Sequence, residues 1–166
     1  MAQTQHKGLL AKLLQQIKHK PLPWLIGVAL TLAAAISINN MTSQTVMIPY
    51  QNAQAVAQGQ EIYQQACASC HGVQLQGQAN WKTRLPNGMM PAPPHSVEGH
   101  TWHHPDALLF KMTKFGTASI APPGYVSAMP AFEDSLSDEE ILAVLAYIKS
   151  TWPAAVQQRH SQMSAH

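Results

Sequence analysis

The only two cysteines of the chain stand three positions apart and are followed at once by a histidine, as Cys67-Ala-Ser-Cys70-His71. In an exported chain such a pair can form a disulfide, and a Cys-x-x-Cys pair can also be a thioredoxin-like redox site. The redox site needs alternating strands and helices, whereas the sequence shows no convincing strand pattern. Zinc would need two further ligands, which only the histidines near residue 100 could supply.

The histidine directly after the second cysteine favours a fourth interpretation, because Cys-x-x-Cys-His is the attachment signature of c-type haem. Two thioether bonds hold the porphyrin edge when both cysteines lie on one side of a helical turn. The imidazole of the next residue then points at the iron as its proximal ligand. The motif therefore predicts one covalent haem c, bound through Cys67 and Cys70, with His71 on the iron.

Around this motif the sequence resembles the class I c-type cytochromes, over about residues 54–152. Gly59 and Tyr63 precede the motif, as in the first helix of that family, where a glycine and an aromatic residue let the first and last helices cross closely. Met129 lies in a proline-containing loop before a last helix. The resemblance implies a small all-α domain packed around one haem, with Met129 as the second axial ligand.

The residue pattern itself predicts two of the helices. Ser137 and Glu140 have the spacing of a capping box, and the helix that follows would bury Ile141, Val144, Leu145 and Ile148. A middle helix is expected between Pro105, which suits a first helical position, and Gly116, which suits a C-terminal cap. Asp106 would lie in its first turn, and its core-facing residues would be Leu108, Leu109, Met112 and Phe115.

The residues alone leave several methionines for the second axial position. Of the eight in the chain, four lie outside the expected domain, and core packing explains Met112. The pair Met89-Met90 and Met129 remain, and the position of Met129 matches that of the family's distal ligand. Ligation by His71 and Met129 would fill both axial positions and favour ferrous iron, which implies an electron carrier and not an enzyme. An open iron site would instead indicate a peroxidase-like enzyme.

Charge divides the chain, because residues 1–23 contain four lysines and no acid, and no charged side chain lies between Lys20 and Glu61. The apolar stretch 22–38 opens this uncharged run and would span about 25 Å as a helix, the short end of a bilayer core. The basic head predicts an N-terminus in the cytoplasm and a haem domain in the periplasm. A cleaved signal peptide is the competing interpretation.

These features divide the chain into five expected segments. They are a cytoplasmic basic amphipathic segment (1–21), a transmembrane anchor (22–38), a flexible tether (39–53), the cytochrome c domain (54–153) and a disordered tail (154–166). Only 11% of the residues are charged, which argues against a nucleic-acid partner. The expected partners are redox proteins, a donor and an acceptor, at the outer face of the cytoplasmic membrane.

Four histidines crowd into residues 95–104 and are not part of the family pattern; they are His95, His100, His103 and His104. Imidazoles suit copper, so the cluster could be a second metal site in a haem protein that handles or senses copper. One of the histidines could also displace Met129 or contact a partner when pH changes. The plainest interpretation is a polar loop that caps the middle helix, with hydrogen bonds to the backbone or the haem propionates.

Overall fold

The computed structural model describes residues 46–165, together with Ile26 and Thr31. All the helices discussed below lie in the unit Thr45–His166, the second of the two units into which the chain divides. The predicted head (1–21), nearly all of the predicted anchor (22–38) and the first part of the tether lie outside the described residues. In the described part of the chain, no helix is long and apolar enough to cross a membrane.

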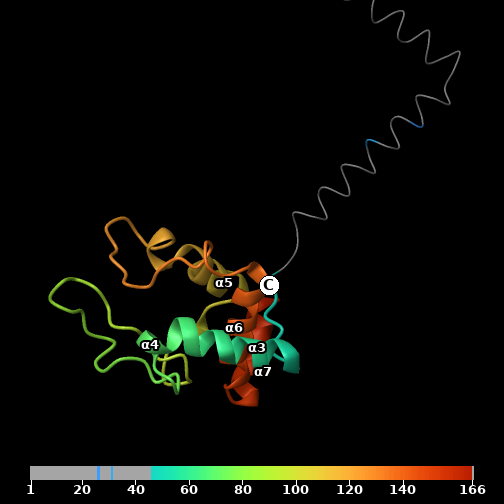
Figure 1. Ribbon diagram of the computed structural model, residues 1–166, viewed down its shortest axis with the longest axis horizontal. Coiled ribbons are helices and arrows are strands. Elements are labelled where there is room, and N and C mark those ends of the chain that lie inside the picture. Colours follow the sequence, from blue (N-terminus) through green and yellow to red (C-terminus); the bar gives the residue numbers. More distant parts are fainter. Residues whose placement is uncertain (1–25, 27–30, 32–45, 166) are drawn as a thin grey trace, which may run out of the picture. The chain divides into compact units, whose positions relative to one another are not determined.

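Helices build this unit, and residues 46–165 contain no strand, which agrees with the all-α prediction. In chain order they are α3 (Ala53–Ile62), the π-helical turn η1 (Tyr63–Cys67), α4 (Ala68–His71), the short 3₁₀ turn η2 (Thr101–His103), α5 (Asp106–Phe115), the 3₁₀ turn η3 (Thr117–Ser119), α6 (Asp138–Ser150) and α7 (Ala154–Ser164). Two long irregular segments, 72–100 and 120–137, extend from the helices toward the same side (Figure 1).

The predicted features of α6 are confirmed. The Ser137 hydroxyl accepts the Glu140 N–H at 3.2 Å, and the Glu140 carboxylate accepts the Ser137 N–H at 2.8 Å. All four expected core residues of α6 are buried. The middle helix α5 is also present, but of its expected core residues only Leu109 is fully buried, and Phe115 remains 42% exposed. Helical spacing therefore predicted a wider buried face for α5 than the structure shows.

The central contact of the fold is the crossing of α3 over α6 (Figure 1). Gly59 is buried at this crossing, and a methyl group on it would lie 1.9 Å from the Ala143 carbonyl oxygen. The two helix backbones therefore touch without intervening side chains. One turn later the fully buried Tyr63 packs its ring 5.4 Å from that of Tyr147. The close crossing implied by the resemblance is confirmed.

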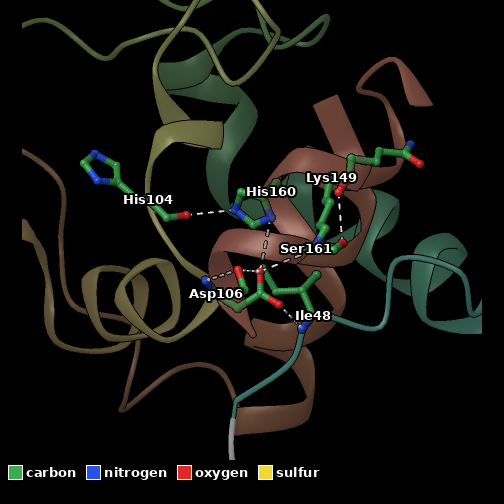
Figure 2. A network of polar contacts seen from close by, with 8 residues as sticks. Ile48, His104, Asp106, Lys149, His160 and Ser161 are labelled. Carbon is green, nitrogen blue, oxygen red and sulfur yellow. Dashed lines mark hydrogen bonds and ion pairs between the residues drawn. The ribbon is translucent and has the colours of Figure 1, made fainter. Parts of the chain in front are cut away.

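A buried carboxylate joins four parts of the chain (Figure 2). Asp106, which is 2% exposed, accepts the main-chain N–H of Ile48 at 2.8 Å and the Ser164 hydroxyl at 3.0 Å. Lys149 in α6, equally buried, brings its ammonium to 3.3 Å from the same carboxylate. The sequence predicted only that Asp106 would favour the start of α5, whereas its carboxylate also holds α6, α7 and the segment before α3.

His160 in α7 completes this network. Its Nδ1 lies 3.3 Å from Asp106, and its Nε2–H donates to the carbonyl of His104 at 2.8 Å. Burial, and then the positive charge of Lys149, lower the pKa of His160, although the hydrogen bond to His104 and the charge of Asp106 oppose this effect. The His160 and Trp152 rings meet at 70° with their centroids 5.0 Å apart.

Two of the predicted segment boundaries are wrong. Residues 154–164, expected as disordered tail, form α7, because His160 and Ser164 have specific buried partners in an otherwise polar sequence. Residues 46–53, expected as the end of the tether, also pack on the domain. Ile48 is buried there, and the Asn52 side chain caps α3 by accepting two main-chain N–H groups.

We expect Asp106→Asn to lower the free energy of unfolding of the haem-loaded protein by about 3–5 kcal/mol, because Lys149 would keep a buried charge without its counterion. Denaturant unfolding followed by circular dichroism measures this loss. The matched control is Asp138→Asn, which breaks the more exposed pair with Lys114 and should cost about 1 kcal/mol or less. Equal losses in the two variants would contradict the assignment.

Gly59→Ala should destabilise the same protein by about 1–3 kcal/mol or more, because the added methyl group meets the backbone of α6. Alanine gains only about 0.5–1 kcal/mol over glycine in helix propensity, so the clash decides the sign. Gln58→Ala, at the exposed neighbouring position, should stay within about 0.5 kcal/mol of the parent. A neutral Gly59→Ala would mean that the helices do not touch there.

Candidate haem site

The cysteine motif lies where α3 passes through η1 into α4. Cys67 ends the π-helical turn and is partly buried, whereas Cys70 in α4 is exposed, and both thiols are free. Burial, with a smaller contribution from the neighbouring Cys70, raises the pKa of Cys67 to about 11. The structure therefore presents two unpaired thiols on one short helical turn, as two thioether bonds to one porphyrin require. The disulfide alternative is not what the structure shows.

His71 is held by a main-chain carbonyl. Its ring is buried, and Nδ1–H donates to the Pro93 carbonyl oxygen at 2.9 Å. This bond fixes the tautomer and leaves the Nε2 lone pair for a metal, as is usual for metal-bound histidines. Burial lowers the pKa of His71 although the bond to Pro93 opposes this effect, so the ring is in the neutral form that binds iron. The structure thus identifies the carbonyl that holds His71.

The segment directly after the motif holds Pro93 in place. The Gly77 N–H donates to the His71 carbonyl at 2.7 Å, and a side chain on Gly77 would approach within 2.6 Å of the Pro93 carbonyl carbon. Gly77 has φ +68°, a conformation that favours glycine. Gln78 pairs with Ala92 through its main-chain N–H at 2.9 Å and its side-chain oxygen at 2.8 Å. This close approach places the Pro93 carbonyl against the histidine.

Tyr63 has a polar role that sequence reasoning missed. Its hydroxyl donates to the Gly72 carbonyl at 2.8 Å, directly after the motif. Burial raises the pKa of Tyr63, so the hydroxyl keeps its proton and remains a donor at any ordinary pH. The aromatic residue at the helix crossing therefore also fixes the end of α4.

Met129 lies in the irregular segment between η3 and α6 and is partly buried. Its Sδ is 3.3 Å from the Thr117 hydroxyl, which donates to it, and its main-chain N–H donates to the Ser127 hydroxyl at 3.1 Å. The sulfur is thus oriented by a hydroxyl from a 3₁₀ turn 12 residues earlier. No sequence pattern marked Thr117 for this contact.

A family of proteins described as cytochrome c oxidase, cbb3-type, subunit III matches residues 54–148, more than half of the chain. The chain belongs to this family of c-type cytochromes. The cytochrome domain therefore binds haem c covalently and is an electron carrier, not an enzyme. No curated protein and no solved structure matches the chain significantly.

The range matched by the cytochrome family leaves out most residues of the Asp106 network. Ile48 precedes the matched range, while Lys149, His160 and Ser164 follow it. The haem motif and Met129 lie inside it. The site residues thus belong to the matched part of the chain, whereas α7 lies outside it and is fastened to it through Asp106.

The four clustered histidines of the cytochrome domain do not converge. His95 stacks on His71, His100 on Trp81 and His103 on Trp102, while His104 lies edge-on to His100. Among the residues placed by the structure, no group of three His, Cys, Asp or Glu side chains could hold a metal ion. The geometry gives the predicted copper site no support. Burial, and then the neighbouring imidazoles of His71 and His100, holds the pKa of His95 well below its usual value.

Proposed function

We propose that the chain is a monohaem electron carrier in which Cys67 and Cys70 form the thioethers, and His71 and Met129 ligate the iron. The observation that carries this proposal is the hydrogen bond from His71 Nδ1–H to the Pro93 carbonyl, which leaves the Nε2 lone pair for a metal. A single haem is supported by the cysteine count, since two cysteines provide one attachment motif. When bound, the haem accepts and releases one electron at its iron.

The ligand pair explains why the domain carries electrons and performs no bond chemistry. A thioether raises the reduction potential relative to a second imidazole, and two protein ligands leave no coordination position for a substrate. The Thr117 hydroxyl, 3.3 Å from the Met129 sulfur, withdraws electron density from that ligand. It therefore favours the ferrous state further.

We place the chain at the cytoplasmic membrane, with residues 22–38 as the anchor and the haem domain in the periplasm among redox partners. The support is the lysine-rich head and the uncharged run that follows it. Because residues 46–53 pack on the domain, the tether shortens to residues 39–45. Seven residues reach at most about 25 Å, so donor and acceptor would dock close to the bilayer.

Replacement of the distal ligand tests the proposal. The purified protein should carry one covalent haem by mass spectrometry and show the sulfur-to-iron charge-transfer band in the ferric state. Met129→His should lose this band and lower the potential by on the order of 0.1 V, a fraction of the ~0.8 V range that axial ligands span. Met89→Leu, which alters the competing candidate, should keep the band. Loss of the band in Met89→Leu but not in Met129→His would reverse the assignment.

Thr117→Val should keep the charge-transfer band but lower the potential by on the order of tens of millivolts, where about 59 mV corresponds to a tenfold change for one electron. The reason is the lost donor to the Met129 sulfur. Ser119→Ala is the matched control, because that hydroxyl in the same turn donates to the Gly116 carbonyl. Equal shifts in both variants, or none in Thr117→Val, would disprove the role of Thr117. Protein-film voltammetry resolves the difference.

A further inference from the structure

His95 lies flat against the ring of the proximal histidine. The centroids of the His95 and His71 rings are 4.0 Å apart, and their planes differ by 22°. The Pro93 carbonyl contacts His71 at the ring edge, through Nδ1, whereas His95 covers a face of the same ring. The two contacts therefore restrict different motions of one imidazole.

The position of His95 is itself fixed by four contacts. Its main-chain N–H donates to Leu75 O at 2.9 Å, and its carbonyl accepts the indole N–H of Trp152 at 2.8 Å. Its Nδ1 shares a hydrogen bond of 2.9 Å with the Thr101 hydroxyl. The ring of Tyr63 meets it edge-on, with centroids 6.3 Å apart. Backbone and ring are thus both held, so His95 is a rigid neighbour.

A single hydrogen bond at Nδ1 determines which nitrogen of His71 would face the iron, but it tolerates a swing of the ring, because hydrogen bonds weaken steeply only when they bend far from linearity. A rigid ring stacked on one face limits that swing. The plane of an axial imidazole determines which iron d orbital it overlaps, so its orientation matters for the electronic state of the haem.

We propose that His95 is a positioning residue that fixes the plane of the proximal imidazole. The proposal rests on ligation by His71. It also connects the end of α6 to the ligand, since Trp152, just beyond that helix, holds the His95 backbone. The contacts run from the end of α6 through Trp152 and His95 to His71.

Electron paramagnetic resonance of the ferric, haem-loaded protein tests this proposal, because its g values depend on the orientation of the axial ligand planes. His95→Ala should shift the largest g value and broaden its line while the charge-transfer band persists. Thr101→Val, which keeps the His95 ring but removes its Nδ1 partner, should shift g in the same direction by less. His95→Phe, which restores a flat ring, should return g toward the parent value.

The matched control is His103→Ala, since that exposed ring stacks on Trp102 and not on His71; its spectrum should equal that of the parent. Parent-like g values in both His95→Ala and Thr101→Val would overturn the inference while leaving the proposed function intact. If His95→Ala does not fold, Thr101→Val and His95→Phe still decide the outcome. A parent-like g value in Thr101→Val, or a g value in His95→Phe that departs from that of the parent, overturns the inference. A parent protein without covalent haem or low-spin iron would overturn both proposals.

Discussion

The contact on which the rest of this domain depends is the backbone-to-backbone crossing of α3 and α6 at Gly59. A side chain at this position would force the helices apart, because the Ala143 carbonyl occupies the space where a methyl group would lie. The chain continues from the crossing through Tyr63 into Cys67 and His71, while α6 continues toward Trp152. The crossing therefore determines where the cysteine motif lies relative to Trp152, which holds the His95 backbone.

The surroundings of His71 are then built from close contacts between segments that lie apart in sequence. His71 receives the Pro93 carbonyl at its edge and the His95 ring on its face. Gly77 permits the close approach of the loop that supplies the carbonyl, and Trp152 anchors the backbone that supplies the ring. Ala92, next to Pro93, pairs with Gln78, and Trp152 holds the His95 backbone, so the His71 ring has little freedom left.

The haem motif, the capped helix α6 and the methionine loop could be predicted from the sequence, because each depends on residues close together in the chain. What could not be read depends on long-range pairing. Nothing local distinguishes Pro93 from its neighbouring prolines, or His95 from the other three clustered histidines. Lys149 did carry a signal, since it lies four residues after Leu145 on the apolar face of α6, and a lysine there requires a buried partner. The helical tail could not be predicted, because His160 and Ser164, which fasten it, stand in a polar sequence.

The Asp106–Lys149 pair also limits how this sequence can change. Neither residue can be replaced alone without leaving a charge in the interior, and Asp106 further binds Ile48 and Ser164. Substitutions at these positions must therefore be accepted together, and a chain that lost α7 would uncover the carboxylate. Simultaneous replacement of such pairs by apolar residues of similar volume is often neutral or stabilising. That route is closed here, because apolar residues in place of Asp106 and Lys149 would leave the Ile48 N–H and the Ser164 hydroxyl without their acceptor.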